Sequence, residues 1–304
     1  MKRKTILSSL LALSLLSTLN LSAGGFGTNE NKKPQLLKGS DGKEYQYVIC
    51  TAQKDGSYYQ AGKRLKNLLG KDFKTDKPLA SAETTDGSRQ NYELMNNGVC
   101  NVIFIQEDYL AFLEGKDKTF FDEKSVVTLE RTENVQLIMK KGASEDDLQS
   151  ADAKVLVGLL NSGGAVSWEL IRTLEKGYAK AKIVNGDIDI SALSDLDRGK
   201  VDAIIRTSHL DPTHDMLAQN IAKMKGIEFI DFDDSELNDK VNFGDGEKSI
   251  YRVVDSLIDK GVVFNTTVKT LETHVAIVID KEKMNKEQKN RILKVITQNS
   301  NSLF

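Results

Sequence analysis

The chain has 304 residues, of which 39% are hydrophobic and 28% are charged, and its formal net charge at pH 7 is −2. This length accommodates two domains of ordinary size, and the composition is typical of a soluble globular protein. A near-neutral charge excludes the strongly basic face that nucleic-acid binding needs, so no nucleic-acid partner is expected.

Residues 1–23 have the pattern of a secretory signal peptide. Basic residues at positions 2–4 precede a leucine-rich apolar run over 6–19, and Ala23 provides a small residue suited to cleavage. An uncleaved membrane anchor is the alternative, although the apolar run is short for a bilayer span. We therefore expect the mature protein to be exported.

The rest of the chain predicts strands that alternate with helices, after a polar and flexible leader over 24–44. The expected strands are 45–51, 79–83, 102–105, 126–129, 135–139, 154–160, 227–231 and 274–279, with a further strand that ends at Arg206. The expected helices are 58–69, 89–96, 109–113, 142–149, 165–178, 216–225, 251–259 and 282–296. This alternation indicates an α/β fold with mostly parallel sheets, in which ligands bind beyond the carboxyl ends of the strands.

A helix–glycine–strand unit occurs twice in the chain. The two copies align on Gly98 and Gly199, about a hundred residues apart, and the alignment places Cys100 on Val201. A repeated unit suggests two similar lobes. We expect the first lobe to comprise 45–133 with 272–304, and the second to comprise 134–271.

Three segments share the order strand, Gly/Ser turn, helix: 48–57, 79–88 and 154–165. Each would direct a helix N-terminus and a hydroxyl group at the carboxyl edge of its sheet, where unpaired N–H groups favour an anion. Gly87 can adopt a positive φ and Ser88 is a good N-cap. The alternative is that these are ordinary βα connections.

Other candidate groups are fewer. Arg206 ends the second repeat strand and could bind a carboxylate with two hydrogen bonds, or could be a solvated strand end. His209, Asp211 and His214 fit no common metal-ligand spacing, so no metal is expected. No nucleotide-binding motif, serine-hydrolase motif or acid–base pair occurs, so neither a cofactor nor enzymatic activity is expected.

These motifs together resemble the TAXI family, the periplasmic solute receptors of tripartite ATP-independent periplasmic (TRAP) transporters. In the first half of the chain, Gly56-Ser57-Tyr58-Tyr59 is similar to the family's Gly-Thr-Tyr-Tyr loop, and Gly87-Ser88 with Asn91 is similar to its Gly-Ser-Val-Glu-Asn helix start. The strand from Gly98 to Gln106 is similar to its Gly-x-x-Asp-(apolar)-Gln strand. In the second half, Ser162-Gly163-Gly164 is similar to its Gly-Ser-Gly-Thr turn, and His209 with Pro212 is similar to its Gly-His-Pro turn. The chain departs from the family at Ala52-Gln53-Lys54-Asp55, at Asp86 and at Ala165.

The resemblance implies a type II periplasmic-binding-protein fold, with two lobes that clamp a ligand between them. It implies a periplasmic, monomeric receptor that delivers a small anionic solute, such as an amino acid or a dicarboxylate, to TRAP-type permease subunits. The implied ligand-binding residues are Ser57, Tyr58, Gly87, Ser88, Asn91, Gln106, Ser162, Gly163, Gly164, Arg206 and His209. The alternatives are an ABC-transporter receptor for a phosphonate- or sulfonate-like anion, or a sensory or enzymatic domain on the same fold.

Cys50 and Cys100 are the only cysteines. An exported chain with two cysteines usually forms one disulfide. If Cys50 stands level with about Ile105 on a parallel neighbour, however, an offset of about five residues separates the two cysteines by roughly 16 Å, well beyond the range of about 4.4–6.8 Å between Cα atoms that a disulfide needs. We therefore expect two unpaired thiols, with a disulfide as the alternative.

Overall fold

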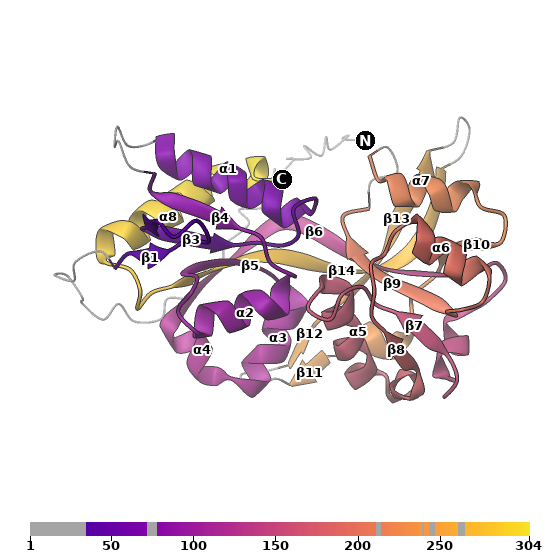
Figure 1. Cartoon of the computed structure of the whole chain (residues 1–304). Coiled ribbons are helices and arrows are strands. Elements are labelled where there is room, and N and C mark those ends of the chain that lie inside the picture. Colours follow the sequence, from indigo (N-terminus) through magenta and orange to yellow (C-terminus); the bar gives the residue numbers. More distant parts are fainter. Residues whose placement is uncertain (1–34, 72–77, 211–213, 239, 243–246, 261–264) are drawn as a thin grey trace, which may run out of the picture.

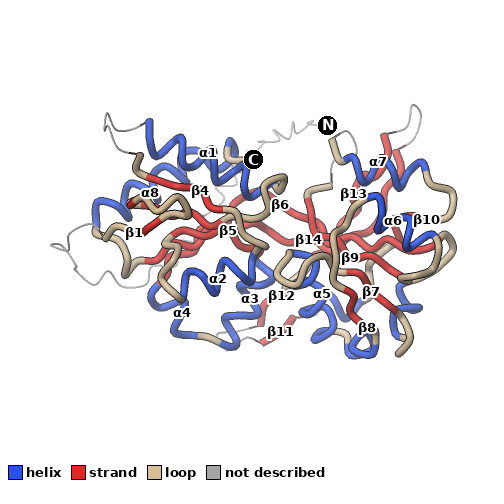
Figure 2. The backbone as a smooth tube through the Cα atoms, in the orientation of Figure 1, coloured by secondary structure: helices blue, strands red, loops and turns tan. Residues whose placement is uncertain are grey.

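The computed structural model describes residues 35–304, except for 72–77, 211–213, 239, 243–246 and 261–264. The expected signal peptide and the start of the leader lie outside the described residues. Figure 1 shows two halves side by side, with two long strands, β6 (Lys124–Lys140) and β14 (Asn265–Asp280), running through both. In each half, helices lie on both sides of the strands (Figure 2).

The first lobe is the half on the left of Figure 1. Its strands are β1 (Leu37–Lys38), β2 (Glu44–Tyr45), β3 (Tyr47–Cys50), β4 (Ala80–Glu83) and β5 (Val102–Gln106), and its helices are α1 (Ser57–Lys71), α2 (Ser88–Asn96), α3 (Glu107–Lys116), α4 (Lys118–Glu123) and α8 (Lys286–Asn299), followed by the short turn η4 (Ser300–Ser302). The β1–β2 hairpin falls within the segment expected to be a flexible leader, and Leu37 packs into the apolar core.

Strand β3 is buried on both faces, as is typical of a central strand in a parallel sheet. It pairs in parallel with β4 and β5. Tyr47 and Ile49 pack with α1 and α8, whereas Val48 and Cys50 pack with α2, α3 and α4. Alternation along one strand therefore builds two apolar layers.

The second lobe is the half on the right. Its strands are β7 (Lys154–Leu156), β8 (Lys182–Val184), β9 (Ala203–Ser208), β10 (Ile227–Ile230) and β13 (Arg252–Lys260), its helices are α5 (Gly163–Leu174), α6 (Ile190–Asp197) and α7 (Met216–Lys223), and its short turns are η1 (Glu145–Gln149), η2 (Lys176–Lys180) and η3 (Ser235–Asn238). Strand β7 pairs in parallel with β8 and β9. Trp168 of α5 is fully buried against one face, and Leu193 of α6 against the other. Strands β11 (Lys240–Asn242) and β12 (Glu247–Ser249) form a separate pair.

The middle of the sheet is antiparallel, which corrects the expectation of mostly parallel sheets. Strand β14 pairs with β5 and β13, and β6 pairs with β9 and β10; β6 and β14 also pair with each other. Hydrogen bonding therefore continues through both lobes in the order β4-β3-β5-β14-β6-β9-β7-β8. The proposed lobe boundaries at 133/134 and 271/272 lie inside these two shared strands.

Two expected strands and one expected helix are different in the structure. The separate strands over 126–129 and 135–139 are parts of β6, whose pairing with β14 shifts register near His274. The helix expected over 251–259 is strand β13, which pairs along its length with β14. Val253, Val254 and Leu257 have helical spacing, but an adjacent strand offers pairing that overrides this local preference.

The repeated helix–glycine–strand unit is present once in each lobe. Helix α2 leads through Gly98 into β5, and α6 leads through Gly199 into β9. The two glycines have φ values of 70° and 74°. The two turns that lead from helix to strand therefore have the same backbone conformation at their glycine.

Cys50 and Cys100 form a disulfide, so the expectation of two thiols is wrong. Cys50 is level with Ile103 rather than with Ile105. Cys100 lies outside strand β5, because its amide donates to the carbonyl of Leu94 in the turn that ends α2. That turn folds back against the face of the sheet that carries Cys50, and the two Cα atoms lie 6.0 Å apart.

Replacing both cysteines with alanine is expected to lower the free energy of unfolding by about 2–4 kcal/mol, because the bond closes a long loop in the unfolded chain. Urea denaturation of the variant and the native protein measures the difference. Thiol counting on the denatured, non-reduced native protein should find no reactive thiol. Two reactive thiols would contradict the pairing.

Candidate functional site

A small cavity lies between the two lobes. Its volume is about 160 Å³, and its wall comprises Ala52, Gln53, Gly56, Ser57, Tyr58, Asp86, Gly87, Ser88, Gln106, Glu133, Ser162, Gly163 and Thr207. Pockets for drug-sized ligands usually measure about 300–1,000 Å³. This cavity therefore fits a solute with only a few heavy atoms.

Three helices begin at the cavity wall. Ser57 is the first residue of α1, Ser88 is the first residue of α2, and Gly163 is the first residue of α5. The amide groups of a first helical turn have no partner inside the helix, and they carry the positive end of the helix dipole. The cavity therefore has a positive backbone potential on walls from both lobes.

Among the described residues, no side chain caps the amide groups at the start of α2. Its N-cap residue is Gly87, which has no hydroxyl or carboxylate to offer. The Ser88 hydroxyl accepts a hydrogen bond from the amide of Gln106, at 3.2 Å. Since an acceptor hydroxyl keeps its own proton, Ser88 can still donate to an oxygen in the cavity.

The start of α5 is different because it has its own cap. The Ser162 hydroxyl accepts from the amide of Ala165 at 3.5 Å and donates to the carbonyl of Val157 at 3.2 Å. Ser162 lines the cavity as expected from the sequence. Its side chain, however, is already engaged within the second lobe.

Two glycines allow the lobes to approach closely. Gly87 has a φ of 123°, and a Cβ atom there would lie 2.8 Å from the carbonyl oxygen of Asn161. A Cβ atom on Gly163 would lie 2.2 Å from the Gln106 side chain. Both positions therefore need glycine for contact between the lobes rather than for a turn alone.

Glu133 and Thr207 line the cavity although the sequence did not single them out, and Glu133 is the charged one of the two. It lies in β6 and is 6% exposed. Its carboxylate accepts hydrogen bonds from the hydroxyls of Tyr58 at 3.0 Å and Ser57 at 3.5 Å. Burial raises the pKa of Glu133 to about 7, although the hydrogen bond from Tyr58 and the charge of Arg131 lower it. The signal in the sequence is a charged residue between two apolar segments. That pattern predicts a break between two strands, whereas the structure has one long strand through this position.

A polar network crosses between the lobes beside the cavity. The Gln106 side chain donates to the Ser167 hydroxyl at 3.3 Å, and Ser167 donates to Asp108 at 2.6 Å. The Tyr251 hydroxyl donates to the same Asp108 oxygen at 2.8 Å. Burial raises the pKa of Asp108. A carboxylate from α3 is thus held by donors from the second lobe.

Arg89 of α2 also bridges the lobes. Its guanidinium pairs with Glu169 of α5. On the other side of Gly87, the Asn161 side chain donates to Asp86 at 3.5 Å. These polar contacts accompany an apolar one, since Phe112 of α3 packs against cores of both lobes.

Seven of the eleven implied ligand-binding residues line the cavity: Ser57, Tyr58, Gly87, Ser88, Gln106, Ser162 and Gly163. Four do not line it: Asn91, Gly164, Arg206 and His209.

These four residues make other contacts. The fully buried Asn91 amide donates to the carbonyls of Thr51 and Phe104. A Cβ atom on Gly164 would lie 2.8 Å from two strand carbonyl oxygens. Arg206 pairs with Asp215 at 2.7 Å. The exposed His209 lies with Nδ1 3.3 Å from a main-chain carbonyl oxygen.

The family of the chain follows from a comparison with known families, in which the NMT1-like family model matches residues 49–303. The chain belongs to the NMT1-like family. The match spans both lobes and every residue of the cavity wall. No curated protein sequence matches this NMT1-like chain.

Several solved structures resemble the NMT1-like chain at low sequence identity. The amino acid ABC transporter substrate-binding protein AbpA from Streptococcus pneumoniae, bound to L-arginine, has 15% identity and a TM-score of 0.44, over 84% of this chain and 89% of that one. A second amino acid ABC transporter binding protein has 13% identity and a TM-score of 0.46, over 84% and 93%. The B. pertussis BvgS periplasmic domain has 9% identity and a TM-score of 0.43, and the match spans 84% of this chain and 41% of that one. The two-lobe α/β fold predicted from the sequence is confirmed by the arrangement of strands and helices in the structure of this chain.

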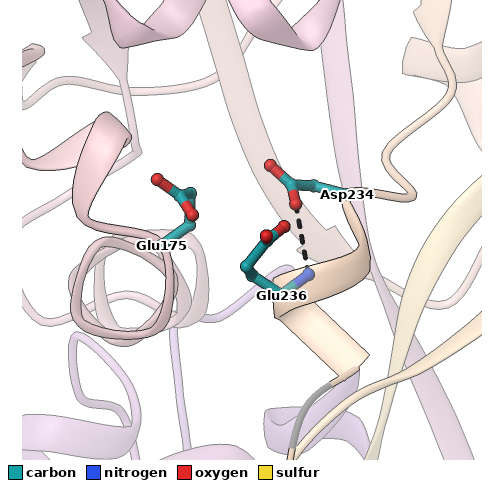
Figure 3. A group of neighbouring side chains, drawn as sticks. All are labelled: Glu175, Asp234 and Glu236. Carbon is teal, nitrogen blue, oxygen red and sulfur yellow. Dashed lines mark hydrogen bonds between the residues drawn. The ribbon is translucent and has the colours of Figure 1, made fainter.

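A group of three carboxylates lies away from the cavity. Glu175, Asp234 and Glu236 have oxygen atoms within 4.8 Å of one another (Figure 3). Each already accepts a hydrogen bond from a neighbouring group: the Gly177 amide, the Tyr178 hydroxyl and the Ser235 hydroxyl, respectively. We therefore assign no metal to this group. The other metal set considered from the sequence includes Asp211, which lies outside the described residues.

Among the described residues, no helix combines the length and apolar character needed to cross a bilayer.

The raised pKa of Glu133 predicts a pH-dependent effect on stability. Between its ordinary value of 4.5 and about 7, the folded protein binds this proton more tightly than the unfolded chain does. The contribution of Glu133 to the free energy of unfolding therefore falls as pH rises through this window. Relative to the native protein, Glu133→Gln should be more stable at about pH 8 than at about pH 5, by up to about 3 kcal/mol.

Urea denaturation at the two pH values tests this expectation. Asp86→Asn is the matched control, because it removes a charge from an exposed side chain at the same cavity. The control should change stability equally at both pH values. An equal effect of Glu133→Gln at both values would contradict the buried setting of this carboxylate.

Gly87→Ala is expected to lower the free energy of unfolding by about 1–3 kcal/mol, because a side chain there meets both a disfavoured φ and the Asn161 carbonyl. Gly70→Ala is the matched control, since Gly70 lies in α1 with no atom within 4 Å of an added Cβ. The control should stabilise the protein by about 0.5–1 kcal/mol. Urea denaturation compares the two variants, and equal effects would refute the close approach at Gly87.

Proposed function

We propose that this protein is an exported receptor that binds a small carboxylate-bearing solute in the cavity between its lobes. The single observation that carries this proposal is the start of α2, which faces the cavity with no side-chain cap and with the Ser88 hydroxyl beside it. Unpaired amides at a helix N-terminus bind carboxylate and phosphate oxygens. A carboxylate is the better match for a wall that also contains Glu133, because a phosphate would bring more negative charge.

The cavity also supports binding rather than turnover. Its polar groups are mostly hydroxyls and amides, which hold a ligand by hydrogen bonds. A solute enclosed there would contact both lobes at once. Its binding energy would therefore favour the closed arrangement that a membrane partner can distinguish from the open one.

The membrane partner that we propose is a TRAP-type permease, and the support is the resemblance of the cavity-wall motifs to the TAXI family. The expected periplasmic location comes from the same resemblance and from the signal-peptide pattern of 1–23. Uptake assays in vesicles that carry a TRAP-type permease test the partnership. An uptake that needs ATP hydrolysis by a partner subunit would assign the protein to an ABC transporter instead.

Native mass spectrometry of the protein as purified tests the receptor function directly. A retained small molecule that carries a carboxyl group is the expected result. Titration calorimetry with that molecule, after its removal by partial unfolding and refolding, then gives the affinity. A retained ligand without any acidic group would overturn the ligand class.

Ser88→Ala is expected to weaken binding of this ligand by roughly 10-fold, the cost of one hydrogen bond to a charged group. Ser81→Ala is the matched control, because Ser81 is a buried serine of β4 that does not line the cavity. The control should leave the affinity unchanged. Equal affinities for Ser88→Ala and the native protein would show that the ligand lies elsewhere.

A further inference from the structure

The charged side chains among the described residues of the cavity wall are Asp86 and Glu133, and both are acidic. They differ in setting, since Asp86 is exposed and Glu133 is buried. A ligand that carried only negative charge would meet favourable amides at α2 but an unfavourable carboxylate at Glu133. The wall therefore matches a ligand with charges of both signs.

The Glu133 carboxylate is held as a hydrogen-bond acceptor. Its two oxygens accept from hydroxyls at the start of α1, at 3.0 Å from Tyr58 and 3.5 Å from Ser57. Hydroxyl donors stabilise the ionised form but bring no positive charge. Each carboxylate oxygen can accept more than one hydrogen bond, so both retain capacity for a further donor.

None of the described residues of the cavity wall is a cation that could pair with Glu133. On its own strand, the charge of Arg131 reaches it, but Arg131 stacks 5.4 Å from the Phe304 ring centroid and does not line the cavity. On α3, Asp108 adds a second negative charge. On α1, Tyr58 is a neutral donor.

We propose that Glu133 binds a protonated amine of the ligand, so that the solute is an amino acid or related zwitterion rather than a dicarboxylate. This inference rests on the proposed function, in which the ligand carboxylate binds at α2. An ammonium group would place a positive charge inside the cavity next to Glu133 and would donate to oxygens that already accept from Ser57 and Tyr58. A second carboxylate at this place would instead put like charges side by side.

Titration calorimetry with matched ligand pairs tests the proposal. Each L-amino acid is paired with the acid in which hydrogen replaces the amino group, such as L-glutamate with glutarate and L-alanine with propionate. The native protein should bind at least one amino acid more tightly than its partner, by roughly 10-fold or more. Glu133→Gln should reduce this ratio to near one, whereas Asp86→Asn, an equal loss of charge at the same wall, should preserve it.

The pH dependence of binding gives a second readout on the native protein. Affinity for the amino acid should rise between about pH 6 and about pH 8, because Glu133 loses its proton in this range. A dicarboxylate bound through a protonated Glu133 would show the opposite trend. This comparison needs no variant, so it decides the question even if Glu133→Gln fails to fold.

The outcomes separate the two proposals. Equal or tighter binding of the amine-free partners, or a preference for the amine that survives in Glu133→Gln, overturns the role of Glu133 and leaves the receptor function standing. Failure of every carboxylate in both series to bind overturns the receptor function and this inference together.

Discussion

Strand β6 belongs to both lobes at once, and much of the structure depends on this constraint. One end of its 17 residues pairs with β14 beside the first lobe, and the other end pairs with β9 inside the second. At the crossing, Glu133 pairs with Thr273 of β14, next to the register shift near His274 and one residue before the pairing with β9 begins. The residue at the crossing is Glu133, so its buried carboxylate is positioned by backbone pairing rather than by a loop.

The two lobes contribute unequally to the cavity. The first lobe provides an uncapped helix start at α2, whose amides can still donate, and the hydroxyls at the start of α1, which already donate to Glu133. The second lobe provides the start of α5, whose cap is satisfied internally by Ser162. Side-chain chemistry for a ligand is therefore concentrated on the first lobe, whereas the second lobe supplies mainly backbone and closure.

The sequence alone predicted the local units well and their connections less well. The three strand–turn–helix segments were recognisable because Gly and Ser have strong preferences at turns and helix starts, and Ser57, Ser88 and Ser162 do meet at one cavity. The setting of Glu133 depends on which strands become neighbours, and the ion pair of Arg206 depends on where the start of α7 packs, since its partner Asp215 is the N-cap residue of that helix. Both are decided by tertiary packing and leave little trace in local spacing.

The same limit explains the disulfide. The assumed register is wrong by two residues, but the corrected offset of three residues, about 10 Å along an ideal strand, would still be too long for a disulfide. The turn after α2 moves Cys100 off the line of its strand. Distances inferred from ideal strands therefore fail first at the ends of strands, where the chain leaves the sheet.

Gly164 has a further consequence for how a solute could enter and leave. A side chain there would collide with the carbonyl oxygens of both Val157, which follows β7, and Ile205 of β9. The first turn of α5 therefore packs closely against these two segments. The helix cannot pivot by itself without breaking that fit. We therefore expect α5 to move together with the sheet of its own lobe in any motion that admits a solute.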